Sequence, residues 1–272
     1  METEDIDFQN SMSPGRCLGT GPFGHVFAID DDNILKVILE MEETEYHTEE
    51  ARERLQLERT IYERLGKHDR ICEFRYAFEG GHVVERLKIN LSGRLFMFAS
   101  VGKPPPLKQT LKWSIQAAEA CAYIHGKGVI KSNLSTRNLF MDKNENIKLH
   151  DFTSSSIDGS VPRERSDKGF GRPGTDATKP DIQDNLFALG GIMYQISTGN
   201  EPSWNSTHSA AHHFRELSRV AIASVITKCW LGQYHSAAEV VKELREIYAK
   251  EIGSPMPTER SYVTGTGTPP TG

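Results

Sequence analysis

The fold of this chain is decided by residues 129–152, VIKSNLSTRNLFMDKNENIKLHDF. Two short apolar runs at 139–141 and 147–149 flank the polar turn 142–146, and this pattern predicts a β-hairpin. We expect the polar side chains at the outer ends of the hairpin to face one cleft. They belong to Asn133, Asn138 and Asp151.

The composition places the chain among globular proteins. It has 272 residues, of which 37% are hydrophobic and 25% are charged, so it is long enough to bury one large core or two lobes. The formal net charge of −5 provides no basic field for nucleic acid, and we expect no nucleic-acid partner.

The cysteines and the chain ends indicate an intracellular protein, cytoplasmic or nuclear. The four scattered cysteines form no Cys-x-x-Cys pair, which is typical of reduced core thiols. The acidic start lacks the apolar core of a signal peptide, and no stretch approaches the roughly 18 apolar residues of a membrane helix. We expect no membrane partner, and disordered tails at 1–14 and 253–272.

A second informative stretch, RCLGTGPFGHVFAI, occupies residues 16–29. It carries Gly19, Gly21 and Gly24 in a G-x-G-x-x-G pattern, with Val26 two residues further on. The same pattern opens dinucleotide-binding units, but there a helix follows, whereas here a β-rich run, an acidic turn and another apolar run follow. The sequence therefore predicts a glycine-rich hairpin, whose backbone N–H groups can approach phosphates closely.

Lys36 lies inside the apolar run 34–38, an unusual place for a lysine. Alone, it is equally well explained as an edge-strand lysine that points to water. The acidic turn before it, at 30–33, is interpreted as a solvated hairpin tip, because its oxygen ligands are too contiguous for a calcium loop. Residues 48–65 and 107–127 have the apolar spacing of long helices.

The order and spacing of these features resemble the eukaryotic protein kinases over about residues 15–250. The resemblance implies an α+β, bilobal protein-kinase-like fold. Its small β-rich N-lobe with one main helix would span residues 15–87, and its larger, mainly helical C-lobe 88–252. The segments around 187–199 and 228–230 resemble small fungal kinase-like proteins.

The resemblance also implies a site for ATP and Mg²⁺. Gly19, Gly21 and Gly24 would cover the phosphates, with Val26 in the same ATP-binding set, and Lys36 would contact them.

Six further residues would complete that site. Glu58 on the predicted helix would pair with Lys36, while Asn138 and Asp151 would hold magnesium. The backbone of 85–87, with Glu85 and Leu87, would bond adenine, and Val84 would guard the rear pocket.

The departures from the family pattern concern the catalytic loop. Asn133 stands where the kinase catalytic Asp belongs, and Lys131-Ser132 replaces His-Arg, the Arg of which reads a phosphorylated activation loop. Thr153 replaces the Gly of Asp-Phe-Gly. Asn185 replaces the Asp that bonds the catalytic-loop backbone, and an Asn there can still accept a hydrogen bond.

Three functional hypotheses follow. The first is a pseudokinase that binds ATP and transfers phosphate poorly, with an unknown protein substrate or partner. The second is an active protein kinase of Ser/Thr or undetermined acceptor type that tolerates Asn133. The third, a fold relic without nucleotide, is disfavoured because the ATP-site residues occur together. Arg137 either reaches the γ-phosphate or lies on the surface.

Overall fold

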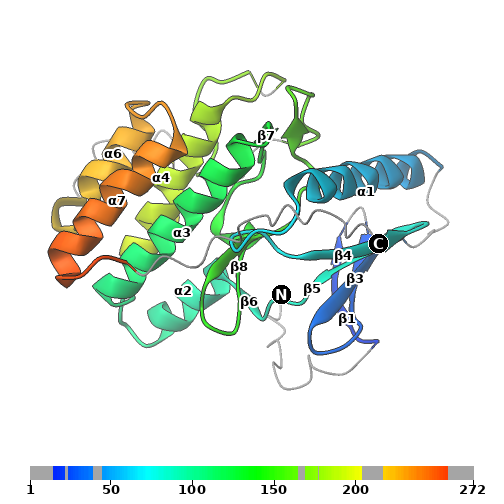
Figure 1. The fold of residues 1–272 in the computed structure, drawn as a ribbon, viewed down its shortest axis with the longest axis horizontal. Helices are drawn as coiled ribbons and strands as arrows, with labels where there is room; N and C mark the ends of the chain where they lie inside the picture. Colours follow the sequence, from blue (N-terminus) through cyan, green and yellow to red (C-terminus); the bar gives the residue numbers. More distant parts are fainter. Residues whose placement is uncertain are drawn as a thin grey trace, which may run out of the picture.

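The computed structural model describes residues 15–21, 24–38, 45–164, 169–176, 178–203 and 217–256, without the side chains of residues 45–48. Its first part is a β-rich lobe and its second part a helical lobe (Figure 1). This confirms the predicted bilobal α+β fold. The predicted N-terminal tail, and the C-terminal tail beyond residue 256, lie outside the described residues.

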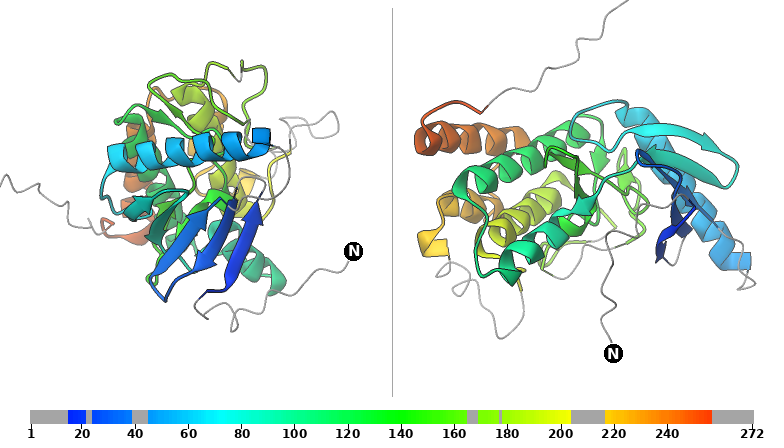
Figure 2. Two further views of the ribbon diagram at one scale, coloured as in Figure 1. Left: turned by 90° about the vertical axis from the view of Figure 1, so that its right-hand side faces the viewer. Right: turned by 90° about the horizontal axis from the view of Figure 1, so that it is seen from below.

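The first lobe is an antiparallel five-stranded sheet covered by one helix. The strand order is β1-β2-β3-β5-β4, and helix α1 (Glu45–Leu65) crosses the sheet (Figure 2). Its apolar side chains, among them the fully buried Ile61, pack toward the sheet. The strands are β1 (Cys17–Gly21), β2 (Gly24–Ala28), β3 (Asn33–Val37), β4 (Phe74–Phe78) and β5 (Gly81–Glu85).

The turn between β2 and β3 is the solvated tip that the sequence predicts. Asp30 is exposed, and its carboxylate accepts bonds from the Asp32 backbone at 2.8 Å and the Asn33 amide at 3.0 Å. The Asp30 carboxylate thus helps to close the turn, in the manner of an Asx-turn, together with the backbone bond from Ile29 to Asn33 at 3.1 Å.

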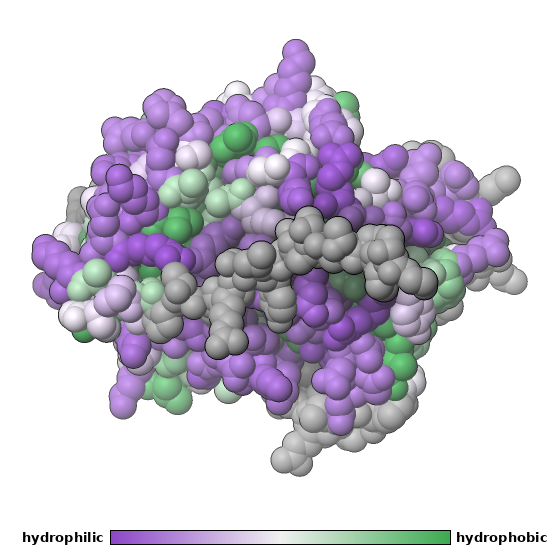
Figure 3. Space-filling view, viewed as in Figure 1, coloured by the Kyte–Doolittle hydropathy of each residue, from purple (hydrophilic) through white to green (hydrophobic). Residues whose placement is uncertain are grey.

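The second lobe is built around two buried helices. Helix α3 (Leu107–His125) packs against α4 (Ile182–Thr198) and α7 (Ala237–Ile252), and both α3 and α4 are buried along most of their length. Helices α2 (Leu91–Ser100) and α6 (Ala223–Trp230) also belong to the described part of this lobe. The described surface on the face of Figure 3 is mainly hydrophilic, with apolar residues in small patches.

Local signals in the sequence fix the ends of α4. Asp181 caps the first turn in a reciprocal capping box with Asp184, and Gly199 ends the helix in the left-handed conformation at φ 79°. This helix carries Asn185 in its first turn, so the capping box determines where the Asn185 side chain lies.

Short strands organise the region between the lobes. The predicted hairpin is present as β8 (Leu139–Met141) and β9 (Ile147–Leu149), with β6 (Ile89–Asn90) beside β8. A second small sheet joins β7 (Val129–Ile130) to β10 (Ser156–Ile157). These two sheets hold both ends of the segment that contains the catalytic-loop positions.

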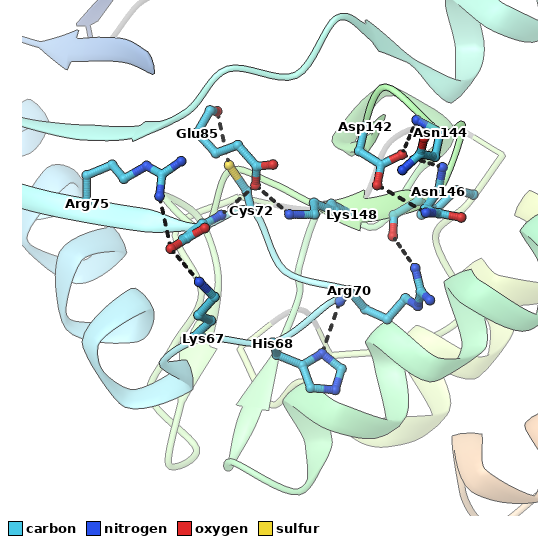
Figure 4. Close-up of polar contacts among 12 residues, drawn as sticks. Lys67, His68, Arg70, Cys72, Arg75, Glu85, Asp142, Asn144, Asn146 and Lys148 are labelled. Atoms are coloured by element: carbon cyan, nitrogen blue, oxygen red, sulfur yellow. Dashed lines mark hydrogen bonds and ion pairs between the residues drawn. The ribbon is translucent and has the colours of Figure 1, made fainter. Parts of the chain in front are cut away.

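Polar contacts join the lobes beside the hairpin (Figure 4). Lys148 of β9 binds the Glu85 carboxylate at the end of β5, with 2.6 Å between Nζ and Oε2. Arg70, in the connection between α1 and β4, donates to the carbonyl of Ile147 at 3.4 Å. These contacts fix the end of β5 relative to the β8–β9 hairpin.

Candidate active site

The centre of the site is a lysine between two carboxylates. The Nζ atom of Lys36 lies 2.8 Å from Oε2 of Glu58 and 3.1 Å from Oδ1 of Asp151. The pairing of Lys36 with Glu58 is therefore present, and Lys36 is not an edge-strand lysine pointing to water. The Glu58 side chain is fully buried, with 0% exposure, and that of Lys36 is 15% exposed.

The charges of this cluster stabilise one another. Burial opposes the charged form of Lys36, but the carboxylates of Asp151 and Glu58 raise its pKa above the ordinary value. Burial likewise raises the pKa of Asp151, yet Lys36 and Lys131 bring it well below its usual value. Both partners are ionised at neutral pH.

Glu58 couples helix α1 to the Asp151-Phe152 turn. Its Oε1 accepts the backbone N–H of Phe152 at 3.0 Å, while its Oε2 faces Lys36. The Phe152 ring packs edge-on against Tyr62 of α1 at 5.2 Å, and Tyr62 stacks on Phe74 of β4 at 5.7 Å. These contacts fix the position of Asp151 relative to the first lobe.

Asp151 adopts an uncommon backbone conformation at φ 59°. A conformation of this kind costs about 1–3 kcal/mol and persists only where other contacts hold it. Here Thr153 donates its hydroxyl to Oδ1 at 2.7 Å, in addition to Lys36. No described residue donates to the other oxygen, Oδ2, which stays available to a ligand.

The catalytic-loop positions are arranged around two amides. Asn138, at the end of the 3₁₀ turn η2 (Thr136–Asn138), donates its Nδ2 to the carbonyl of Asn133 at 2.7 Å. This bond leaves Oδ1 of Asn138 as a possible cation ligand. The Oδ1 atom of Asn133 is buried and has no hydrogen-bond partner among the described residues.

The residues present fit a magnesium site in which the nucleotide supplies part of the ligands. Asp151 and Asn138 each offer one oxygen, and no group of three His, Cys, Asp or Glu side chains able to hold a metal occurs within the described ranges. Magnesium keeps several waters and binds substrate phosphates, so two protein oxygens suffice when ATP supplies the others.

Asn185 of α4 supports the catalytic loop by hydrogen bonds to its backbone, as the sequence predicts. Its Oδ1 accepts the backbone N–H of Lys131 at 3.0 Å, and its Nδ2 donates to the Lys131 carbonyl at 2.7 Å. His125 lies 3.1 Å from the same Oδ1. The neighbouring Asp184 is engaged in the capping box instead.

Lys131 is a site residue whose contacts the sequence did not predict. Its side chain is 1% exposed, and its Nζ lies 5.9 Å from the centre of the Phe152 ring. Burial lowers its pKa, while Asp151 and Glu58 oppose that effect. The one sequence signal was its position directly after the apolar pair 129–130, which indicates a buried strand end.

The three glycines of β1 and β2 differ in whether a side chain would fit in their place. Gly24 has φ 154°, and a Cβ there would lie 2.8 Å from the carbonyl oxygen of Val37, so no side chain fits. Around Gly19 there is open space, and at Gly21 the nearest atom to a Cβ would be 3.8 Å away. Strand β1 is exposed, so this backbone can approach a ligand. Val26 of β2 packs against the core opposite Lys36.

The predicted hinge residues differ in whether their backbone groups are already hydrogen-bonded. Glu85 donates its backbone N–H to Glu73 at 2.8 Å, and its carbonyl accepts the Cys72 thiol at 3.4 Å. The backbone of Leu87 makes no hydrogen bond to a described residue, so its N–H and C=O are available. Val84 is 1% exposed and belongs to the core.

Arg137 lies in a surface ion pair with Glu201, at 2.7 Å, and is 43% exposed. This favours the surface interpretation over contact with a γ-phosphate.

The segment after Thr153 is attached to α1 by ion pairs. Arg54, which is 4% exposed, contacts the Ser154 hydroxyl at 3.3 Å and the Glu164 carboxylate at 3.1 Å. Arg64 forms a two-pronged pair with Asp158 at 3.0 and 2.9 Å. The carboxylates of Glu164 and Asp158 therefore hold the segment after Thr153 to the arginines of α1.

Comparison with known proteins agrees with this geometry. The sequence matches the protein kinase domain over residues 12–260, and the chain belongs to that family. It is 23% identical to mouse Aurora kinase C over 208 residues, covering 75% of each chain. It is 24% identical to CBL-interacting serine/threonine-protein kinase 2 of Arabidopsis thaliana over 232 residues, 74% of this chain and 46% of that protein.

A third relative, the serine/threonine-protein kinase US3 homolog of Gallid herpesvirus 2 (strain GA), is 30% identical over 116 residues, 39% of this chain and 28% of that protein. For the first four relatives matched, the aligned part covers between 7% and 31% of their length. No helix in the described part of the chain is long and apolar enough to span a membrane.

Proposed function

We propose that this protein kinase domain binds ATP with Mg²⁺ and transfers phosphate weakly or not at all, as a pseudokinase. The observation that carries the proposal is the contrast within one site. Lys36, Glu58 and Asp151 form a closed ionic cluster, whereas the position of the general base holds the amide of Asn133.

The binding half of the proposal rests on groups that remain available to a nucleotide. Lys36 would contact the phosphates, and the backbone of 19–24 would cover them. The free backbone groups of Leu87 would bond adenine, beside Glu85 as the other predicted hinge residue. Asn138 and Asp151 would hold Mg²⁺, which would neutralise charge on the phosphates.

The part of the proposal that concerns weak phosphate transfer rests on the chemistry of an amide. A carboxylate accepts the proton of a substrate hydroxyl, and such a base contributes roughly 10² to 10⁴ in rate. The Asn133 amide cannot take that proton. Its buried Oδ1 has no partner among the described residues, so it can still orient a hydroxyl by accepting a hydrogen bond.

An active protein kinase is the alternative, and the same unpaired Oδ1 favours it. Phosphoryl transfer depends mainly on positioning and on charge neutralisation, and the groups for both are in place. The resemblance to small fungal kinase-like proteins and an intracellular location remain predictions from the sequence.

Thermal unfolding with ATP tests the binding half. A ligand that binds only the folded state adds RT ln(1 + [L]/Kd), about 2.7 kcal/mol at a hundredfold excess over Kd. We expect ATP with magnesium to raise Tm, and ATP with EDTA to raise it less. An unchanged Tm at millimolar ATP with magnesium would contradict nucleotide binding.

A further inference from the structure

A buried histidine stands beside the central ion pair. His82 of β5 is paired in register with Lys36 of β3, and its side chain is 1% exposed. Its Nε2 lies 3.4 Å from Oε2 of Glu58. Neither ring nitrogen has a hydrogen-bond partner among the described residues.

This arrangement places the ammonium group of Lys36 and the ring of His82 at one carboxylate oxygen. Oε2 of Glu58 receives Lys36 at 2.8 Å and faces His82 at 3.4 Å, while Oε1 is engaged by the backbone of Phe152. Buried polar groups are nearly always hydrogen-bonded, so an unpaired imidazole beside a buried carboxylate calls for an explanation. Lys36 stays charged at neutral pH, whereas a histidine can gain or lose its charge.

The surroundings of His82 set its protonation. Helix α1 presents Glu58, Arg59 and Tyr62 to it, strand β3 presents Lys36, and the segment at the end of β9 presents His150 and Asp151. From β4 it meets the apolar ring of Phe74 at 6.0 Å. Burial lowers the pKa of His82, Glu58 opposes this and Lys36 adds to it, so the ring is neutral at pH 7.

A surface pocket borders this histidine. It has a volume of about 820 Å³ and lies between α1 and the turn from β4 to β5. His82 lines it together with Leu55, Arg59, Phe78 and Gly81. The pocket thus brings solvent close to His82 without the lobes opening.

We propose that His82 is a positioning residue that makes nucleotide binding depend on protons through Glu58. When the ring is neutral, Oε2 of Glu58 holds Lys36 in place for the phosphates. When the ring is protonated, it competes with Lys36 for that oxygen and repels the lysine. Nucleotide affinity then falls as the pH drops below the ordinary histidine range. This inference rests on the proposed function, since it concerns the same nucleotide.

The first test compares wild type with His82→Gln, which keeps a hydrogen-bonding side chain without a titratable ring. Dissociation constants for ATP with magnesium would be measured by calorimetry at pH 7.5 and pH 5.5. Comparing the two proteins at each pH cancels the titration of ATP itself. We expect similar affinities at pH 7.5, and binding about fivefold weaker in wild type than in His82→Gln at pH 5.5. An equal ratio of the two constants at both pH values would overturn the proposal.

A second test needs no nucleotide and separates this inference from the proposed function. Thermal unfolding of wild type, His82→Gln, Glu58→Gln and the double variant gives the coupling between the two positions. We expect the coupling to be larger at pH 5.5 than at pH 7.5, because only the protonated ring forms an ion pair with Glu58. A coupling that is the same at both pH values would refute the role of His82 even if ATP binds. Should His82→Gln fail to fold, His82→Met serves as the non-titrating variant in both tests.

Absence of ATP binding at pH 7.5 in wild type would contradict the proposed function and the nucleotide part of this inference. The coupling between His82 and Glu58 would still decide whether the histidine acts on the carboxylate.

Discussion

The ionic cluster, formed by Lys36 and Glu58 of the first lobe with Asp151 of the second, and the catalytic loop of the second lobe differ in what they retain. In the cluster, the side chains of Lys36, Glu58 and Asp151 keep both the charges and the contacts expected of a phosphate site. In the loop, the backbone arrangement remains, held by Asn185, while the base position carries the neutral Asn133.

This difference separates the support of the catalytic loop from the chemistry at its base position. An amide at position 185 preserves the loop because it offers both an acceptor and a donor to the backbone of Lys131. An amide at position 133 keeps the shape of a carboxylate but lacks its basicity. The proposed function therefore predicts that the same kind of substitution is tolerated at position 185 and limiting at position 133.

Breaking the ionic cluster should give the largest effect. Lys36→Met leaves the Glu58 carboxylate buried without its cation, and removal of one partner from a buried pair costs about 3–5 kcal/mol. We expect a matching loss in the free energy of unfolding, measured with urea, and loss of the Tm increase caused by ATP.

The matched control is the double variant Lys36→Met, Glu58→Gln, which removes both charges. It should be more stable than Lys36→Met alone while still failing to respond to ATP. Equal stability of wild type and Lys36→Met would show that the pair contributes nothing to folding.

Removing the support of the loop should have an intermediate effect. Asn185→Ala deletes two hydrogen bonds and leaves the buried Lys131 backbone unsatisfied, which costs about 2–3 kcal/mol. Urea unfolding measures the loss, and Asn200→Ala, at an exposed position just past α4, should change stability by less than about 0.5 kcal/mol. Similar values for both variants would contradict a supporting role for Asn185.

Acidic pH should weaken the fold through its partly buried histidines. Burial lowers the pKa of His125 and His68 below 6.5, so the unfolded chain takes up protons before the folded chain does. Stability is thus complete above pH 6.5 and decreases as the pH falls below that value. Tm measured from pH 7.5 to 5 should drop, and the drop should be smaller in His125→Gln than in a variant of the exposed His235.

The ion pair between α1 and the segment after Thr153 should have the smallest effect. Glu164 is 39% exposed, and pairs of this kind contribute about 0–1 kcal/mol. Glu164→Gln should lower the free energy of unfolding within that range, and less at 1 M salt. A loss above about 2 kcal/mol would mean that this carboxylate holds the segment more firmly than its exposure indicates.

The sequence predicted the fold and the pairing of Lys36 with Glu58, because the order and spacing of its motifs resemble those of the protein kinases, but it did not predict the contact of Lys36 with Asp151. Hairpin, helices and the partner of Lys36 follow from motifs that are linear in the chain. The role of Asn185 was also predictable, because its donor and acceptor capacity does not depend on distant residues.

Contacts between segments far apart in the chain could not be predicted in this way. The stretch HVVERL gave no sign that His82 faces Glu58, 24 positions earlier, because strand register and helix rotation decide that contact. The position of Lys131 under the Phe152 ring, and the Thr153 hydroxyl on Asp151, likewise depend on the folded turn. Arg137 was ambiguous because its partner Glu201 is 64 residues away.

The most direct test of the central claim measures ATP binding and phosphate transfer on the same preparations of wild type, Asn133→Asp and Asp151→Ala. Restoring the base should increase transfer by about tenfold or more, since each 1.36 kcal/mol of barrier is a factor of ten. We predict that wild type binds ATP with magnesium but shows at most trace transfer, and that Asn133→Asp raises transfer without tightening binding. Robust transfer by wild type, unchanged in Asn133→Asp and lost in Asp151→Ala, would contradict the account and identify an active kinase.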